Sequence, residues 1–428
     1  MMEFPVQNDA VTLGILMVVL AAIFKTNQMP AFRKFYKFVP ALLLCYFIPA
    51  LLNSPLGIID AENSQLYYMA SRYLLPASLV LLCLNIDLRG VIKLGPKALI
   101  MFFTATVSII IGAPIALWIM GQFEPQLLQT GGPDAIWRGL ATIAGSWIGG
   151  GANQTAMKEI YGASNTLFSA MIVVDVVVAN IWMAFLLFGA GMSDGLDKKL
   201  KADNSAIEDL KNRVEKQQLA LARIPTFTDI FVILGVGFGV VAISHFLSDA
   251  ISPAIAGYIE AALATDPNSS LRLFTSFGST FFWLVVFATI GGVLLSFTRA
   301  RSLEGAGASK FGSIFLYVLV ATIGMNMNLG QLVRDWEIFK FIIIIGFIWI
   351  IIHITILLVV GKLIKAPFFF IAVGSQANIG GAASAPIVAS AFSPALAPVG
   401  VLLAVLGYAI GTFGAIIAAI LMQAVAVG

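Results

Sequence analysis

Residues 144–156 read AGSWIGGGANQTA, and residues 373–386 read VGSQANIGGAASAP. In both, Gly-Ser is followed by a short spacer, Ile-Gly-Gly and a group of small and polar residues. A glycine inside a helix costs about 1 kcal/mol relative to alanine, and unpaired backbone groups are costly in lipid. We therefore predict two broken helices whose freed N–H and C=O groups are satisfied by protein, water or a ligand.

A second pair of matching stretches favours an internal repeat. LNIDL at 84–88 resembles MNMNL at 325–329, and each of them ends an apolar segment. The two pairs occur in the same order, with about the same spacing, in each half of the chain. We expect the two halves to be copies of one helical unit.

The composition is that of an integral membrane protein. Of 428 residues, 59% are hydrophobic and 11% are charged, and the mean hydropathy is +0.95, whereas soluble proteins carry about 25% charged residues. The net charge of +3 lies mostly in short loops, so we expect membrane lipid and no nucleic acid as a partner. Cys45 and Cys83 fall inside apolar runs, which favours neither a disulfide nor a metal site.

The apolar runs predict all-α architecture with about 13 transmembrane helices. Twelve are clear, and a weaker one, at 252–264, makes the thirteenth. The clear spans lie at 11–25, 38–53, 73–89, 97–121, 136–160, 164–190, 227–247, 281–298, 311–331, 338–361, 366–392 and 394–424.

Basic residues in short loops predict the topology, because they favour the cytoplasmic side. The loops around Lys34, Lys93, Arg301 and Lys365 are basic and are placed inside. These assignments agree only if the chain crosses once more between 247 and 281. We expect a bacterial inner-membrane protein with its N-terminus outside, its C-terminus inside and no cleaved signal peptide.

The same count predicts the domain organisation. We predict a first repeat at 1–190, with its broken helix near 145–155, a hydrophilic linker at 191–226 placed outside, a linking span at 227–249, and a second repeat at 250–428, with its broken helix near 374–386. Matched spans are seven apart, and an odd offset makes the two repeats inverted. Inverted repeats with discontinuous helices are typical of secondary transporters.

Polar residues that surround the glycines are the predicted substrate site, because polar groups at membrane depth are costly. A helix-packing seam is the alternative, but it does not explain the polar cluster. The predicted substrate-binding residues are Ser146, Gly149, Gly150, Gly151, Asn153, Ser375, Gln376, Asn378, Gly380, Gly381 and Ser384.

Asp175 is the sharpest single prediction, since it is a lone carboxylate in the middle of an apolar span. It is predicted to ligate sodium or to carry a proton; the alternative is a structural aspartate that is hydrogen-bonded within the bundle. The other predicted ion-coupling residues are Gln154, Thr155, Asn180, Asn326 and Asn328. Secondary predictions are Asp87 in the site, His353 and His245 as structural histidines, and Lys158 and Glu159 as a cytoplasmic pair.

The leading functional hypothesis is sodium- or proton-coupled symport of a small organic, anionic solute, with no cofactor beyond a sodium ion. A cation/proton antiporter is the alternative, although no second acidic residue lies near Asp175 in the sequence. A passive channel fits two polar helix breaks less well. An intramembrane enzyme is not expected, because neither HExxH nor GxSxG occurs.

These motifs resemble a known family. The stretches GSWIGGGANQTAMKEIYG, VGSQANIGGAASAPIVASAF and LNIDLRG are similar to the YjcL-like bacterial membrane family, a group with a domain of unknown function. More distantly, the arrangement resembles the cation:proton antiporter and anion transporter superfamily, which includes bile-acid–sodium and glutamate–sodium symporters. That resemblance implies a panel domain, a mobile core with two crossed broken helices and an elevator mechanism. A homodimer is compatible with it.

Overall fold

The computed structural model describes residues 5–39, 41–84, 86, 88–128, 131–202, 224–266, 269–326, 336–393 and 396–427. Within these residues the chain is helical, apart from loops and one bridge between Val6 and Ile59. The predicted all-α class is confirmed. Eight helices are long and apolar enough to cross a membrane, and up to ten if two bent pairs count as spans.

The first half of the chain supplies these helices: α1 (Asp9–Asn27), α2 (Arg33–Phe38), α3 (Ala41–Asn53), α4 (Leu66–Met69), the π-helical turn η2 (Ala70–Leu74), α5 (Leu75–Leu84), α6 (Leu88–Lys93), α7 (Pro96–Phe123), α8 (Ile136–Tyr161), α9 (Asn165–Ala190) and α10 (Ser193–Leu200). The second half supplies α12 (Phe227–Thr265), η4 (Ser270–Gly278), α13 (Thr280–Ser296), η5 (Arg299–Ala306), α14 (Ala308–Met325), α16 (Trp336–Leu363), α17 (Phe368–Ile379), α18 (Gly381–Phe392) and α19 (Ala397–Val427).

The helices pack into two groups. The core bundle contains α7, α8, α9, α16, α17, α18 and α19, and the flanking bundle contains α1, α3, α5, α12, α13 and α14. The packing in the flanking bundle has a two-fold pattern: α3 lies on α14 while α13 lies on α5, and α1 contacts α3 and α14 while α12 contacts α13 and α5. This pattern is what two intertwined copies of one unit would produce.

Helix α8 is a re-entrant helical hairpin, the first hairpin. Its backbone leaves the helical region at Gly150 (φ 76°, ψ −176°). The rings of Trp137 and Tyr161 lie 5.6 Å apart between centroids, and Arg138 Nη1 donates to the Tyr161 carbonyl oxygen. In a straight helix, residues 137 and 161 would be about 36 Å apart. The predicted crossing at 136–160 is therefore wrong, because the chain returns to the side from which it came.

Helices α17 and α18 form the second hairpin. The chain reverses at Gly381, whose φ is 57°, and Gln376 Nε2 donates to Ser384 Oγ across the turn (2.7 Å). At the open end, the ring centroids of Phe369 and Phe392 are 5.3 Å apart. The crossing predicted over this segment is wrong for the same reason.

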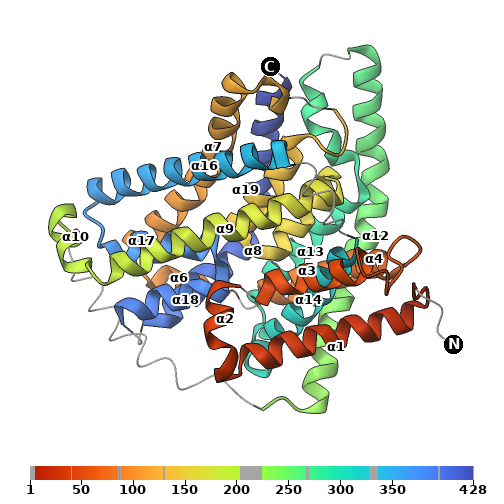
Figure 1. Ribbon diagram of the computed structural model, residues 1–428, viewed down its shortest axis with the longest axis horizontal. Coiled ribbons are helices and arrows are strands. Elements are labelled where there is room, and N and C mark those ends of the chain that lie inside the picture. The colour runs from red at the N-terminus through yellow and green to blue at the C-terminus, as the bar shows by residue number, and fades with distance from the viewer. Residues whose placement is uncertain are drawn as a thin grey trace.

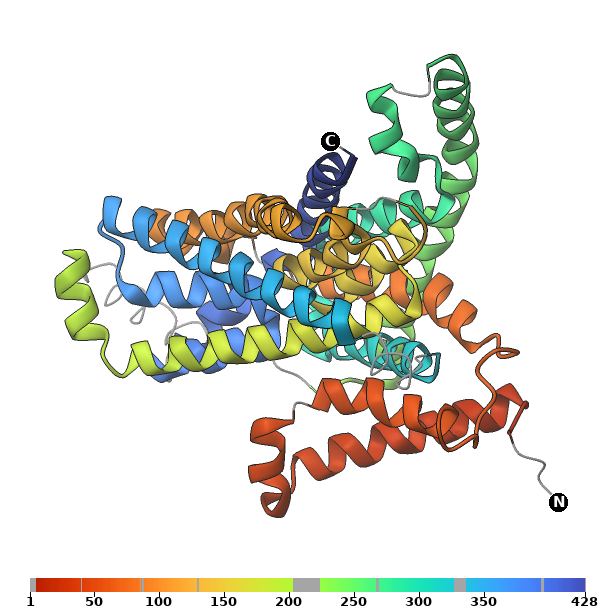
Figure 2. The same ribbon diagram turned by 45° about the horizontal axis from the view of Figure 1, so that its top comes forward.

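Helix α12 continues unbroken from Phe227 to Thr265. The predicted span at 252–264 is thus the end of this helix and not a separate crossing. At 1.5 Å per residue its 39 residues extend about 58 Å, well beyond the roughly 30 Å of a hydrocarbon core. Figure 2 shows its end, with η4, standing clear of the other helices.

With both bent pairs counted as spans, these corrections leave five candidate crossings and one hairpin in each half. The equivalent crossings are α1 and α12, α3 and α13, α5 and α14, α7 and α16, and α9 and α19, with a hairpin before the last of each set. Matched helices are now five apart, which is again an odd offset. The inversion expected from the sequence therefore needs no extra crossing, and the two hairpins would open toward opposite sides.

Contacts between the ends of helices agree with the count of ten crossings. Ser64 Oγ donates to Asp9 Oδ1 (2.7 Å) on the side that holds the start of α1. The Phe368 amide donates to Asp197 Oδ1 (2.8 Å), which joins the open end of the second hairpin to the linker helix α10. In Figure 1, α10 lies at the far left and α2 and α6 lie at the lower left, whereas the end of α12 lies toward the top right. We now expect the linker inside and the end of α19 outside.

Cysteine labelling tests this topology. We expect Glu62→Cys and Thr265→Cys to react with an impermeant reagent from outside, and Gly195→Cys only from inside, because ten crossings place them so. The native Cys45 and Cys83 are buried, so the background is low. Labelling of Glu62→Cys and Gly195→Cys from the same side would contradict the ten-crossing fold.

Candidate functional site

The tip of the first hairpin lies between α19 and the flanking bundle, because Gly150 faces Tyr408 of α19 and Gly151 faces Leu316 of α14. Both arms of the first hairpin are buried, but Gly150 and Gly151 at its tip are half-exposed. Gly380 at the tip of the second hairpin is half-exposed too. The positive φ of Gly150 is strained for any residue with a side chain. Backbone without a side chain is therefore partly exposed at both tips, and its predicted role in binding stays a prediction.

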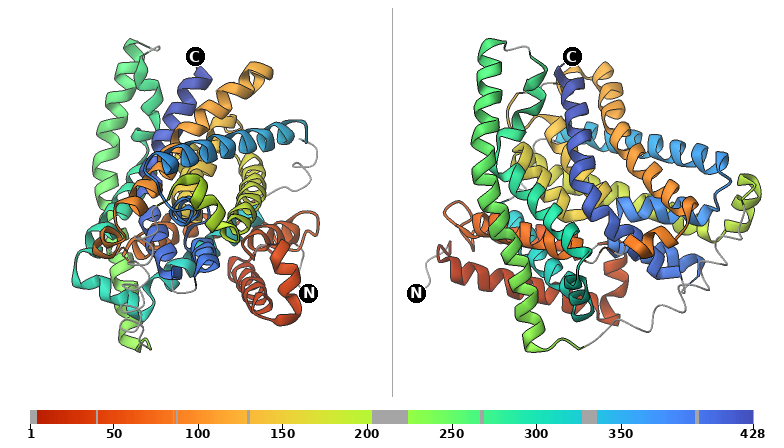
Figure 3. Two further views of the ribbon diagram at one scale, coloured as in Figure 1. Left: turned by 90° about the vertical axis from the view of Figure 1, so that its left-hand side faces the viewer. Right: turned by 180° about the vertical axis from the view of Figure 1, so that it is seen from behind.

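Helix α19 contacts both hairpins beside their tips, and Figure 3 shows it passing through the centre of the molecule. A Cβ atom at Gly411 would lie 2.5 Å from Gly149 Cα. A Cβ atom at Gly407 would lie 2.7 Å from the Ile148 carbonyl oxygen and 3.5 Å from that of Ala377. The tight crossing is thus between each hairpin and α19, rather than between the two broken helices alone.

Asp175 on α9 joins the two arms of the first hairpin. Its Oδ2 accepts from Ser146 Oγ (2.6 Å) on the first arm and from Gln154 Nε2 (3.1 Å) on the second. Its Oδ1 accepts from Trp147 Nε1 (2.7 Å). Three donors suit an ionised carboxylate, and all four side chains are buried. The carboxylate therefore stabilises the reversal at Gly150.

Two asparagines fasten the hairpins to neighbouring helices through the same arrangement. Asn153 Nδ2 donates to the carbonyl oxygens of Gly149 (2.9 Å) and Tyr408 (3.2 Å), and its Oδ1 accepts from Thr412 Oγ1. Thr412 lies one turn after Tyr408 on α19. These contacts engage both the amide nitrogen and the oxygen of Asn153.

The second hairpin repeats this arrangement on α7. Asn378 Nδ2 donates to the carbonyl oxygens of Gly374 (3.0 Å) and Phe102 (3.2 Å), and its Oδ1 accepts from Thr106 Oγ1 (2.8 Å). Thr106 again lies one turn after the residue that supplies the carbonyl group. Each asparagine holds one hairpin in place, so the two side chains support the predicted substrate site from the side of the neighbouring helix.

Gln376 leaves one acceptor without a partner at the second tip. Its Nε2 donates to Ser384 Oγ, but its buried Oε1 accepts no hydrogen bond within the described residues. The side chain is 1% exposed. An unpaired buried acceptor costs on the order of 1–3 kcal/mol, so this oxygen is suited to a cation or to a donor group of a ligand.

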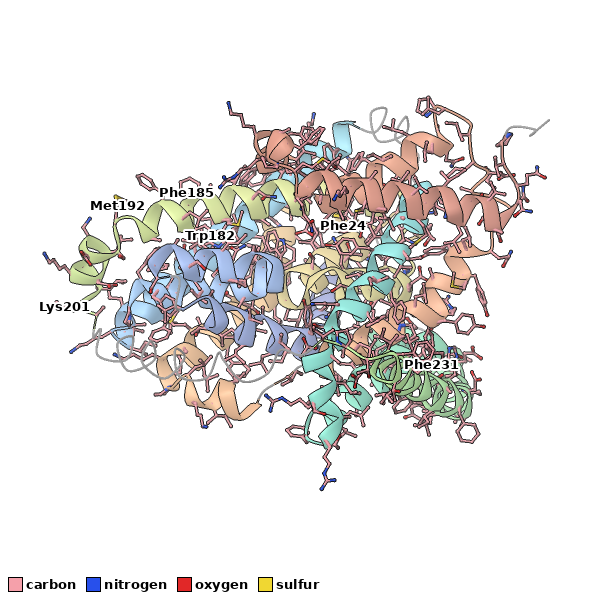
Figure 4. All side chains as sticks on the ribbon, turned by 90° about the horizontal axis from the view of Figure 1, so that it is seen from below. Phe24, Trp182, Phe185, Met192, Lys201 and Phe231 are labelled. Atoms are coloured by element: carbon pink, nitrogen blue, oxygen red, sulfur yellow. The ribbon has the colours of Figure 1, made fainter. Side chains whose placement is uncertain are left out.

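A histidine network lies on the other side of α17. His353 Nδ1 is 2.7 Å from Ser108 Oγ, and its Nε2 is 2.7 Å from Ser375 Oγ. Ser108 Oγ donates to the Ala105 carbonyl oxygen and Trp182 Nε1 donates to Ser375 Oγ. A neutral His353 with its proton on Nδ1 satisfies every group here. In Figure 4, Trp182 points toward the core from α9, opposite to Phe185.

Other predicted residues lie elsewhere. Asn180 is exposed and donates to the Val176 carbonyl oxygen, so it does not share the environment of Asp175. Thr155 donates to the Gly151 carbonyl oxygen, and Asn326 caps the end of α14 in the flanking bundle. Asn328, like Asp87, lies outside the described residues.

The contribution of α19 to the site was not predicted from the sequence. Its glycines at 400, 407, 411 and 414 share one helix face, and this spacing could have indicated a close contact. No group of three or more His, Cys, Asp or Glu side chains that could hold a metal ion forms among the described residues; the sodium role of Asp175 stays a prediction.

Similarity to known proteins extends over nearly the whole chain. A family model described as "Protein of unknown function (DUF819)" matches residues 14–425. The chain is 25% identical over 378 residues to the "Uncharacterized membrane protein YjcL" of Bacillus subtilis strain 168, covering 85% of each chain. The family match at residues 14–425 includes both hairpins and the linker between the two halves. The chain therefore belongs to this DUF819 family of membrane proteins.

Proposed function

We propose that the protein is a secondary transporter that binds a small organic solute between the two hairpin tips. One observation carries the proposal: two buried helical hairpins, whose half-exposed glycine tips both lie against α19. Backbone of this kind at membrane depth is tolerated only where protein or an aqueous cavity surrounds it. Binding at such breaks near the midplane is the usual arrangement in secondary transporters.

The same geometry supports an elevator-like movement. The asparagine contacts fasten both hairpins to core helices, so the core bundle would move as a unit against the flanking bundle. Because the hairpins would open toward opposite sides, such a movement would expose the site to one side at a time.

Acceptor groups at the tips favour coupling to a cation. The carbonyl oxygens of Ile148 and Ala377 approach the same point beside Gly407. Gln376, the residue before Ala377, has an Oε1 atom that accepts no hydrogen bond in the described part of the chain. Carbonyl and amide oxygens suit sodium, and the C-terminal ends of the first arms carry partial negative charge. We propose symport with sodium, with Asp175 holding the hairpin that completes the site.

Counterflow in vesicles tests this function. Purified protein in vesicles preloaded with one solute of a library should accumulate the same labelled solute, with a sodium-dependent rate. We expect Gln376→Leu to lower the apparent sodium affinity at least tenfold, because it removes the free acceptor, while Gln122→Leu, at an exposed position on α7, changes little. Uptake that depends on protons and not on sodium would identify the proton as the coupling ion. Solute flux without counterflow would favour a channel.

A further inference from the structure

A charged cluster joins the outer end of the first hairpin to the flanking bundle. Arg72 Nη1 donates to Glu159 Oε2 (2.9 Å), and Lys158 Nζ lies 3.3 Å from Glu159 Oε1. Lys158 Nζ also donates to the Tyr67 hydroxyl (2.7 Å), which in turn donates to Glu159 Oε1. Tyr67 and Arg72 belong to α4 and η2, while Lys158 and Glu159 end the second arm. In the ten-crossing topology we expect this end of the hairpin outside, whereas the sequence predicted a cytoplasmic position for Lys158 and Glu159.

The cluster has two positive side chains, Arg72 and Lys158, and one negative side chain, Glu159, so one positive charge is in excess. Both ion pairs formed by Arg72 and Lys158 among the described residues use the single carboxylate of Glu159. The side chains of Lys158 and Glu159 are 6% and 10% exposed. An uncompensated charge in such surroundings is costly and is usually balanced by a partner. A singly charged anion would complete the balance.

Arg72 can hold that anion. Its hydrogen bonds use Nη1 alone, to Glu159 and Ser71, so Nε and Nη2 keep their donors free among the described residues. The guanidinium group lies 4.3 Å from the Phe281 ring centroid, which restrains its plane. The side chain is 29% exposed, so solutes can reach it. A planar guanidinium edge matches a carboxylate in a two-point contact.

The backbone around Arg72 is unusual as well. Residues 70–74 form a π-helical turn, and single π-turns occur frequently at functional sites. This turn brings Arg72 toward Glu159 while its carbonyl oxygen contacts His245 Nε2 on α12 (3.0 Å). The backbone of Arg72 is therefore held by the flanking bundle, while its side chain pairs with the hairpin.

We propose that Arg72 and Lys158 form an outer binding site for a small monocarboxylate, separate from the hairpin tips. Lys158 lies eight residues beyond Gly150, which is about 12 Å along a helix. Arg72 supplies the hydrogen bonds, and Lys158 supplies the uncompensated charge. The site raises the local concentration of an anionic solute before it reaches the tips. This role in uptake rests on the proposed function, whereas binding itself does not.

Thermal unfolding of the purified full-length protein with acetate as the probe tests the site. We expect acetate to raise the unfolding temperature, and the uncharged acetamide to leave it unchanged. Arg72→Gln should weaken acetate binding at least tenfold, and Arg72→Lys should recover part of it. Lys34→Gln, at an exposed lysine of α2, is the matched control and should bind acetate normally.

The Glu159→Gln variant best distinguishes a binding role of the cluster from a purely structural role. It removes the carboxylate that competes with the solute, so acetate binding should become several-fold tighter even though the free protein becomes less stable. A cluster with only a structural role would lose stability in this variant without any gain in affinity, and that result would overturn the proposal.

Two other results would also overturn it: stabilisation by acetamide equal to that by acetate, and unchanged acetate binding in Arg72→Gln. Sodium-driven counterflow that survives in Arg72→Gln with an unaltered KM would remove the site from the uptake route and leave the transporter assignment intact. Acetate binding that depends on Arg72, in a protein without any counterflow, would instead refute the transporter and preserve the site.

Discussion

Asp175→Asn is expected to lower the stability of the protein on the order of 3 kcal/mol and to reduce transport more than tenfold. The carboxylate accepts hydrogen bonds from Ser146, Trp147 and Gln154, and a bond to a charged group contributes about 1.5–3 kcal/mol. An asparagine can offer only one oxygen, so its NH2 group would face donors. The measurement is thermal unfolding together with counterflow.

Control variants separate an anchoring role from direct ion binding. If Asp175 holds the hairpin, Trp147→Phe should reproduce part of the destabilisation while the sodium response remains. If Asp175 ligates sodium, Asp175→Asn should abolish the sodium response and Trp147→Phe should not. Asp194→Asn, an exposed aspartate of α10, should behave as wild type. Unchanged stability and transport in Asp175→Asn would remove the carboxylate from both roles.

Gly411→Leu should have the other large effect, a loss of folded protein from the membrane or a complete loss of uptake. Even a Cβ atom at this position lies 2.5 Å from Gly149 Cα and 2.8 Å from Asn153 Nδ2. Backbone atoms cannot move aside as a flexible side chain can, so the hairpin must separate from α19. Forced overpacking of this kind costs about 1–3 kcal/mol or more. Protein yield after size-exclusion chromatography and counterflow report the result.

A matched glycine shows whether the crowding is the cause. Gly235→Leu, on α12, has nothing within 4 Å of its Cβ and should leave both yield and uptake unchanged. Gly150→Ala should fall between the two: the nearest atom, Tyr408 Cε1, is 3.4 Å away, but the positive φ remains strained. A functional Gly411→Leu protein would show that α8 and α19 do not pack closely.

Much of the site followed from the sequence because its signals were local. Glycines beside polar residues inside apolar segments indicated both tips, and Asp175 stood out as a carboxylate without a nearby cation. The direction of the chain at each tip was not local information. A hairpin and a span both need about 25 apolar residues, and hydropathy does not report whether the chain continues or returns.

That ambiguity also explains the erroneous span at 252–264. Counting each hairpin as a crossing placed the basic loops on the wrong side, and one more crossing was introduced to correct them. The polar residues near the ends of α8 could have indicated the hairpin. Arg138 and Lys158 lie near opposite ends of one segment, which suits a hairpin whose two ends face the same aqueous side. The role of Asn153 could not be foreseen, because its partners lie on α19, 255 and 259 residues away.

The distance along the chain between the first hairpin and α19 sets an order of assembly during synthesis. Thr412 follows Asn153 by 259 residues, so at about 5–20 residues per second it leaves the ribosome roughly 13–50 s later. Until then the tip at Gly150 lacks the surface on which it packs, and its backbone needs water or a chaperone. The first half of the protein can therefore be inserted early, but its hairpin reaches its final position only when the last helix is complete.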